Sequence, residues 1–170
     1  SWSSTCSTPD LPGAHHVLPR IVAEAARRFG DRAAFRLPSG APLSYRALDR
    51  ASDEVAAGLA ARGLGEGDVL LLSLPSGPEY AVAYLAAAKV GAVTAGANPR
   101  LRARERGLVA DAVGPTLVLA TEALTVGLPG DVAVEVVTPT DDPGRLLGLL
   151  RNVDHDVLDL VEDAGRPVCI

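Results

Sequence analysis

Apolar residues recur at helical spacing in four stretches of this chain, and polar residues fill most of the positions between them. In the first stretch the apolar side chains share one face of a helix that Gly30 would end. The second stretch is strongly amphipathic, and the third is rich in alanine. The pattern predicts helices at 17–29, 46–62, 79–90 and 100–113.

Short apolar runs lie between these helices and predict strands. The predicted strands are 33–37, 43–45, 69–74, 92–96, 116–120 and 132–137. The first two flank a turn that contains proline and glycine, which indicates a hairpin. The others alternate with helices, so we expect an α/β fold with a largely parallel sheet, right-handed crossovers and flanking helices. The run at 69–74 is apolar throughout, which is typical of a strand buried on both faces.

The helix at 46–62 has a polar face that we expect to lie in solvent. Its members are Arg46, Asp49, Arg50, Asp53 and Glu54. Ser44 is placed to cap the helix, and the glycines of 63–67 would end it.

After residue 138 the periodicity weakens, and the predictions become shorter. We expect a short helix that starts near Asp142 and carries the leucines of 146–150, with 157–161 continuing it after a break. Residues 167–170 resemble the start of another strand. We expect residues 1–16 to form a flexible leader and residues 17–170 to form a single α/β subdomain.

Charge and composition narrow the classes of partner. The net charge is −5 and only 4% of the residues are aromatic, so we expect no nucleic-acid partner, because phosphates and bases need basic and aromatic surfaces. The apolar stretch 81–97 is short for a membrane span and contains Lys89, which favours a buried helix and strand. The N-terminal residues do not have the pattern of a signal peptide. Cys6 and Cys169 lie far apart in sequence, so we expect free thiols and a cytoplasmic protein.

Two turn sequences invite comparison with phosphate-binding loops. The glycines of 63–67 follow a helix and open a strand, the reverse of a dinucleotide-binding loop, so we interpret them as a helix end. Residues 75–78 do follow a strand and open a helix, where backbone N–H groups could hold an anion. They lack the lysine and the glycine spacing of a P-loop. We expect a structural turn there, and an anion site remains an open alternative.

The other polar motifs also have structural interpretations. Asn98 before Pro99 is a stop-and-turn signal, with substrate contact as the alternative. The four arginines that follow are expected to form a solvated face paired to acidic neighbours, with phosphate binding as the alternative. They are Arg100, Arg102, Arg104 and Arg106. The histidines of 15–16 and 154–156 have no partner at metal-ligand spacing, so we expect no metal site.

Several short motifs occur in a fixed order along the chain: FGDRA at 29–33, LSY at 43–45, GD at 67–68, LP at 74–75, AKVGA at 88–92 and ANP at 97–99. Their order and spacing resemble the N-terminal part of the AMP-forming acid–thiol ligases. That superfamily contains acyl-CoA synthetases, luciferases and peptide-synthetase adenylation domains. The run GANPRL is similar to ligases of fatty or aromatic acids. The resemblance implies an incomplete portion of the large N-terminal domain of an adenylate-forming enzyme.

The resemblance also implies an ATP-dependent carboxylic acid–CoA ligase that forms an acyl-adenylate and then a thioester, with ATP, Mg²⁺ and CoA as the cofactors of the complete enzyme. The family's phosphate loop and catalytic lysine would follow this segment, and Lys89 does not match that lysine. We therefore assign no catalytic, cofactor-binding or metal residue, and we expect the chain to be inactive alone. Its expected partners are the remainder of the ligase and a small carboxylic acid. A free-standing α/β binding or regulatory module, and a homo-oligomer formed through an open sheet edge, remain alternatives.

Overall fold

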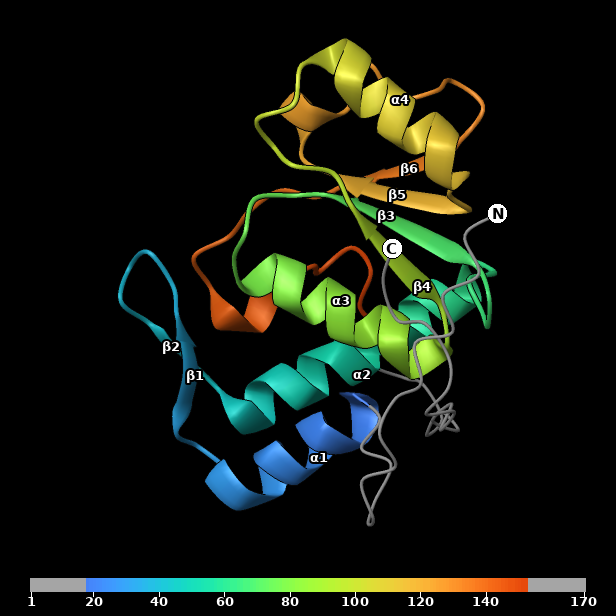
Figure 1. Cartoon of the computed structure of the whole chain (residues 1–170). Coiled ribbons are helices and arrows are strands. Elements are labelled where there is room, and N and C mark those ends of the chain that lie inside the picture. Colours follow the sequence, from blue (N-terminus) through green and yellow to red (C-terminus); the bar gives the residue numbers. More distant parts are fainter. Residues whose placement is uncertain (1–17, 153–170) are drawn as a thin grey trace, which may run out of the picture.

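The computed structural model describes residues 18–152 as two sheets with helices packed around the larger one (Figure 1). The helices are α1 (Leu18–Phe29), α2 (Tyr45–Ala61), α3 (Pro78–Val90) and α4 (Ala103–Val113), with the 3-10 turns η1 (Glu122–Leu124) and η2 (Pro143–Arg145). The strands are β1 (Ala33–Arg36), β2 (Pro42–Ser44), β3 (Val69–Ser73), β4 (Val93–Gly96), β5 (Leu117–Ala120) and β6 (Ala133–Val136). The predicted α/β class and the predicted order of these strands and the four helices are confirmed.

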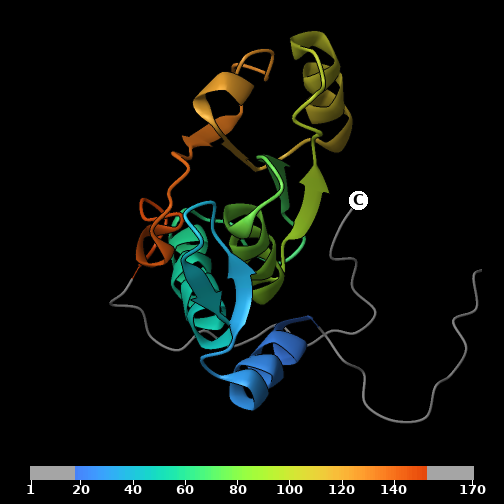
Figure 2. The same ribbon diagram turned by 90° about the vertical axis from the view of Figure 1, so that its left-hand side faces the viewer.

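The larger sheet is parallel, with the strand order β4-β3-β5-β6, and β1 and β2 form a separate antiparallel hairpin. Helices α2 and α3 lie on one side of the sheet and α4 on the other (Figure 1). The turned view in Figure 2 shows α1 and the hairpin beside α2. The predicted parallel sheet with flanking helices and an N-terminal hairpin is therefore confirmed.

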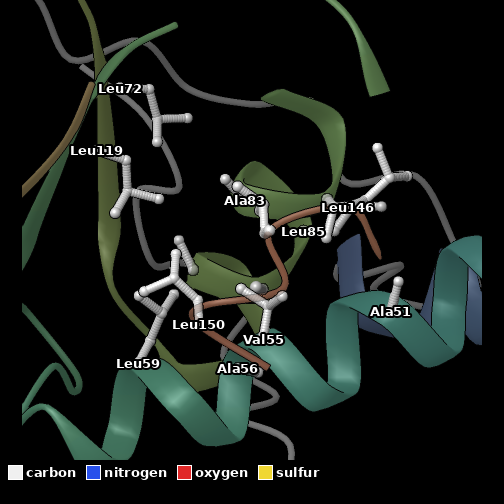
Figure 3. Close-up of a cluster of buried hydrophobic side chains, with 14 of the residues drawn as sticks. Ala51, Val55, Ala56, Leu59, Leu72, Ala83, Leu85, Leu119, Leu146 and Leu150 are labelled. Atoms are coloured by element: carbon white, nitrogen blue, oxygen red, sulfur yellow. The ribbon is translucent and has the colours of Figure 1, made fainter. Parts of the chain in front are cut away.

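The central strand β3 is buried on both faces because its leucines alternate between two cores. Leu70 and Leu72 belong to the core that includes α2 and α3. Leu71 belongs to a smaller core with α4. All three are fully buried, and burying one leucine side chain contributes about 1.5–3 kcal/mol. Figure 3 shows Leu72 and Leu119 of the sheet facing the side chains of the helices.

The ends of α2 follow the sequence prediction. Ser44 Oγ accepts a hydrogen bond from the Ala47 N–H at 3.1 Å, which satisfies one donor at the start of the helix. Gly63 adopts a φ of +83° just after the helix, a conformation that favours glycine. Within residues 18–152, no helix is long and apolar enough to cross a membrane.

Helix α4 starts at Ala103, three residues later than predicted, because Asn98 turns the chain. The Asn98 side-chain oxygen accepts the Arg100 N–H at 2.9 Å, and the Leu101 N–H bonds to the Asn98 carbonyl at 3.0 Å. The Glu105 carboxylate then accepts the Arg102 N–H at 2.8 Å. These bonds place Arg100 and Leu101 in a turn, and the predicted stop-and-turn role of Asn98 is confirmed.

Two aspartates of α2 that were predicted to face solvent instead pair with a buried lysine. Lys89 of α3 is 2% exposed, and its Nζ donates to the carboxylates of Asp49 at 2.7 Å and Asp53 at 2.5 Å. It also donates to the Asp49 carbonyl at 3.1 Å. The prediction is wrong for Asp49, whose side chain is 21% exposed, because α3 packs over this part of α2 and brings a cation to it. Asp53 also pairs with this cation, but its side chain stays 44% exposed. The result is an ion-pair cluster that links α2 to α3.

Glu54, which was also predicted to face solvent, is 3% exposed. Its carboxylate accepts a hydrogen bond from Arg50, one helical turn earlier, at 2.9 Å. It accepts another from Arg151, near the end of the described chain. The Glu54 carbonyl accepts the Asn152 N–H at 2.9 Å. The prediction is wrong here because the segment at 143–152 folds back over α2.

We use the name strap for residues 143–152, which form turns in place of the predicted short helix. Leu147 adopts a φ of +51°, which no α-helix accommodates, and two glycines weaken the helical alternative. Asp142 caps η2 by accepting the Gly144 N–H at 2.8 Å. The strap buries Leu146, Leu147 and Leu150 and leaves Leu149 exposed. The predicted segments 157–161 and 167–170, Cys6, Cys169 and the histidine motifs lie outside the described residues.

The strap lies against α2 (Figure 2), and Figure 3 shows Leu150 of the strap near Val55 and Leu59 of the helix. The contact at Gly58 requires a glycine. A Cβ atom at position 58 would lie 1.6 Å from the Leu150 carbonyl oxygen. One helical turn later, Arg62 donates to the Leu149 carbonyl and to the Gly58 carbonyl, each at 3.0 Å. The close approach of the strap therefore depends on the missing side chain and on the arginine beside it.

Substitution Lys89→Met tests the ion-pair cluster. Methionine keeps most of the buried chain length, but it leaves two carboxylates near each other without their cation. We expect the free energy of unfolding, measured by urea denaturation, to fall by about 3 kcal/mol. The control Arg104→Met, at an exposed position of α4, should change it by less than about 0.5 kcal/mol. Equal effects of the two substitutions would contradict a stabilising role for the cluster.

Substitution Gly58→Ala tests the contact between the strap and α2. In an exposed helix this change stabilises by roughly 0.5–1 kcal/mol. Here we expect the opposite sign, a loss of about 1–3 kcal/mol, because the methyl group must displace the strap. The control Gly130→Ala, which has no atom within 4 Å of the new Cβ, should leave stability nearly unchanged in the same thermal unfolding experiment. Stabilisation by Gly58→Ala would show that the strap does not lie on the helix.

Candidate functional site at the carboxyl edge of the sheet

The strand order creates a crevice between β3 and β5. From β3 the chain crosses to β4 through α3, on one face of the sheet, and then returns past β3 to β5 through α4, on the other face. From the carboxyl end of β5 the chain then continues outward to β6, so the connections that leave the carboxyl ends of β3 and β5 run in opposite directions. In open α/β sheets such a switch point is where ligands usually bind.

A cavity of about 390 Å³ lies at this switch point. Leu74 and the turn that follows it form one wall, Thr121 after β5 forms the base, and the loop after β6 forms another wall. The tip of the β1–β2 hairpin, with Leu37 and Pro38, covers one side. The cavity is thus built from four loops that are distant in sequence.

Two hydrogen bonds hold these loops around the cavity. The Glu79 carboxylate at the start of α3 accepts the Thr140 N–H at 3.0 Å. The Asp141 carboxylate accepts the Ser39 N–H at the hairpin tip, at 3.1 Å. Both acidic side chains of the cavity wall therefore already have a hydrogen-bond partner, and each joins two loops.

The charges of the wall disfavour an anionic ligand. Among residues 18–152, Glu79 and Asp141 are the only ionisable residues that line the cavity, and both are acidic. Glu79 also occupies the first turn of α3, where a carboxylate interacts favourably with the helix dipole. An incoming phosphate would have to compete with that carboxylate without help from a basic side chain. The geometry therefore suits an apolar or neutral ligand better than the anion that was considered as a ligand for residues 75–78.

A second cavity, of about 490 Å³, lies between the end of β6 and the strap. Its wall consists of residues 135–140, Arg145 and residues 147–150. Two of these wall residues are joined by Arg62, whose guanidinium donates to the Glu135 carboxylate at 2.7 Å and to the Leu149 carbonyl at 3.0 Å. Leu149 itself is 74% exposed at the rim.

The arginines of the 100–106 cluster separate into two groups. Arg100, Arg102 and Arg104 are exposed, as expected for a solvated face. Arg106 is 4% exposed and donates to the carbonyl oxygens of Val126 at 2.6 Å and Leu101 at 2.9 Å. The expectation of a solvated side chain is wrong for Arg106, because the loop after η1 packs over it.

No group of three or more histidine, cysteine, aspartate or glutamate side chains within residues 18–152 could hold a metal ion. On the surface of α1, the hydrogen bond from Arg27 lowers the pKa of the Glu24 carboxyl. Lys89 is paired with its two aspartates, away from both cavities. The glycines of 63–67 serve as the predicted helix end.

Sequence comparison gives a consistent assignment for most of the chain. The model of the family described as AMP-binding enzyme matches residues 22–164. The chain is 38% identical over 99 residues to 4-coumarate–CoA ligase 5 of Oryza sativa subsp. japonica, a match that covers 58% of this chain and 18% of the relative. It is 39% identical over 94 residues to the salicyl-AMP ligase / salicyl-S-ArCP synthetase of Mycobacterium tuberculosis, covering 53% of this chain and 17% of the relative. The chain thus spans less than a fifth of the length of these curated relatives.

Structural comparison gives the same result. The N-terminal subdomain of NpsA from Klebsiella oxytoca superimposes with a TM-score of 0.71 at 25% sequence identity, and the match covers 90% of this chain and 37% of that one. The described fold is therefore similar to one part of a larger N-terminal subdomain.

Substitution Glu79→Ala tests the bond that closes the switch-point cavity. Removing the acceptor should speed hydrogen exchange of the Thr140 amide and lower the free energy of unfolding by about 1 kcal/mol. Glu79→Gln keeps an acceptor oxygen at the same place and should retain most of the amide protection. Unchanged exchange of the Thr140 amide in Glu79→Ala would show that the carboxylate does not hold this loop.

Proposed function

Because this chain belongs to the AMP-binding enzyme family, we propose that it is the first part of the N-terminal domain of an ATP-dependent carboxylic acid–CoA ligase. The observation that carries the proposal is the family match over residues 22–164. Relatives several times longer than this chain, which are named as acid ligases, support it. In this proposal residues 17–170 are one α/β subdomain, residues 1–16 are a flexible leader, and the remainder of the ligase is the main partner.

The proposed reaction belongs to the complete enzyme. A carboxylic acid reacts with ATP to give an acyl-adenylate and pyrophosphate, and the CoA thiol then displaces AMP to form the thioester. The described residues do not fit the ATP phosphates or Mg²⁺, since no basic side chain of residues 18–152 lines the switch-point cavity and these residues contain no metal-ligand cluster. We therefore assign no catalytic, cofactor-binding or metal residue to this part of the chain. Its role is to provide the framework on which the reacting groups of the remaining chain are placed.

We propose an aromatic acid as the substrate class, with a fatty acid as the alternative. The names of the relatives support the aromatic class, since they specify 4-coumarate and salicylate. The run GANPRL at 96–101 supports either class. The relationship to this family also supports our proposal that the enzyme is cytoplasmic.

One observation favours a second function, a free-standing α/β binding or regulatory module. The switch-point cavity is bordered by four loops of the described chain, and its wall is largely apolar. A neutral apolar molecule that binds there would need no further domain. In that case the same fold would act without the chemistry of the ligases.

ATP–pyrophosphate exchange discriminates between the two functions. We expect the 170-residue chain alone to give no exchange above background with 4-coumarate, salicylate or a medium-chain fatty acid. The longer protein encoded by the full reading frame should give exchange that depends on the added acid, and more with the aromatic acids than with the fatty acid. A control without acid measures the background.

Other outcomes would change the assignment. Exchange catalysed by the 170-residue chain would place the reacting groups within it and contradict the role of a framework. A reading frame that stops after Ile170, with a soluble and monodisperse product, would favour the binding module.

A further inference from the structure

The two cavities share one wall. Val137, Pro139 and Thr140 line both the switch-point cavity and the cavity beside the strap. They belong to residues 137–142, which we call the shared loop. This loop leads directly from the end of β6 into the strap. A displacement of the shared loop therefore changes both cavities at once.

Two long-range hydrogen bonds hold the shared loop at the switch-point cavity. The Thr140 N–H donates to the Glu79 carboxylate of α3 at 3.0 Å. The Asp141 carboxylate accepts the Ser39 N–H of the hairpin tip at 3.1 Å. Each bond has one partner outside the loop, so the loop forms this wall only while its backbone is presented to α3 and to the hairpin.

A series of local hydrogen bonds connects the shared loop to the strap. The Thr140 hydroxyl accepts the Asp142 N–H at 3.2 Å, and the Asp142 carboxylate accepts the Gly144 N–H at 2.8 Å. The Arg145 N–H then bonds to the Asp142 carbonyl at 3.0 Å. These consecutive turns leave little freedom between the two segments, so a movement of the strap is passed to the loop.

The other end of the strap is held by α2. Arg62 donates to the Leu149 carbonyl at 3.0 Å, and the Glu54 carbonyl accepts the Asn152 N–H at 2.9 Å. Between these anchors Leu147 adopts a left-handed conformation, which is strained for leucine and persists only where surrounding contacts hold it. The docked position of the strap is therefore maintained by its contacts with α2, and release would relieve the strain at Leu147.

We propose that the strap acts as a latch for the switch-point cavity. While the strap is docked on α2, the shared loop stays bonded to Glu79 and to the hairpin tip. When the strap leaves α2, the loop leaves with it and the cavity loses the wall formed by Thr140 and Asp141. Because coupling between two sites is reciprocal, loss of the Glu79 bond in turn weakens the docking of the strap. All of these contacts lie within residues 18–152, so the latch does not depend on the proposed ligase reaction.

Hydrogen exchange of the 170-residue chain tests the latch through the substitution Arg62→Met, which removes the anchor at the end of the strap away from the loop. The Asn152 amide reports the docking of the strap, and the Thr140 amide reports the position of the loop. We expect both to exchange at least about tenfold faster, by similar factors, because they open together. The Val137 and Ala97 amides, which bond to carbonyls of neighbouring strands, should change by less than about twofold, because the sheet stays folded.

Two further variants separate the strap from surface charge. Gly58→Ala releases the strap by steric contact with Leu150 and should give the same pattern of exchange as Arg62→Met. Glu135→Gln removes the charged partner of Arg62 but leaves the bond to the Leu149 carbonyl, and the Arg62–Glu135 pair is partly exposed. It should change the Thr140 amide by less than about twofold. Acceleration by Glu135→Gln equal to that by Arg62→Met would overturn the latch.

The reciprocal experiment uses Glu79→Ala, at the opposite end of the latch. We expect the Asn152 amide to exchange at least about threefold faster in this variant, since the strap loses the support of the loop. An unchanged Asn152 amide would overturn the coupling.

Two results with Arg62→Met would also overturn the proposal. If the Asn152 amide accelerates while the Thr140 amide keeps its original rate, the strap leaves α2 without the loop. If the amides of the strap, the loop and the sheet all accelerate by the same factor, the substitution destabilises the whole fold and the strap is no separate latch.

Discussion

Burial of β3 on both faces and pairing on both edges is the constraint from which the rest of the architecture follows. Leu70 and Leu72 need an apolar cover on one face and Leu71 needs one on the other, so the helices must divide between the two sides of the sheet. The chain leaves β3 toward β4 and leaves β5 toward β6, on opposite sides of the sheet. The crevice at the carboxyl ends of β3 and β5 is a geometric result of that division.

The sequence predicted the parts of the fold that depend on local periodicity. The continuous apolar run at 69–74 and the amphipathic spacing of 46–62 each correspond to an observed element. It failed where a polar side chain is paired with a residue far along the chain. Lys89 lies 40 residues after Asp49, and Arg151 lies 97 residues after Glu54. Periodicity shows that such residues are polar, but it contains no information about a partner that a later segment brings to them.

The same limit applies to the candidate site. The turn at 75–78 was recognisable from the strand before it and the helix after it. Its ligand preference depends on Thr140 and Asp141, which come from a loop more than 60 residues away and bring an acidic, already bonded wall. The strap was mispredicted for a related reason, since its leucines resemble a helix until Gly58 offers a surface that an extended backbone can approach. The local sequence pattern was sufficient to predict the helices and strands. It was insufficient to predict the contacts that shape the cavity wall and the strap.

The burial of Lys89 has a chemical consequence beyond stability. It is the single lysine among the sixteen lysine and arginine residues of the chain, its side chain is 2% exposed, and its ammonium group is paired with two carboxylates. An activated acyl group, such as the mixed anhydride of a carboxylic acid and AMP, acylates neutral amines readily, whereas guanidinium groups stay protonated and are poor nucleophiles. While α2 and α3 remain packed, the folded subdomain offers such a reagent no accessible ε-amine. Acylation at Lys89 would therefore mark chains in which these two helices have separated.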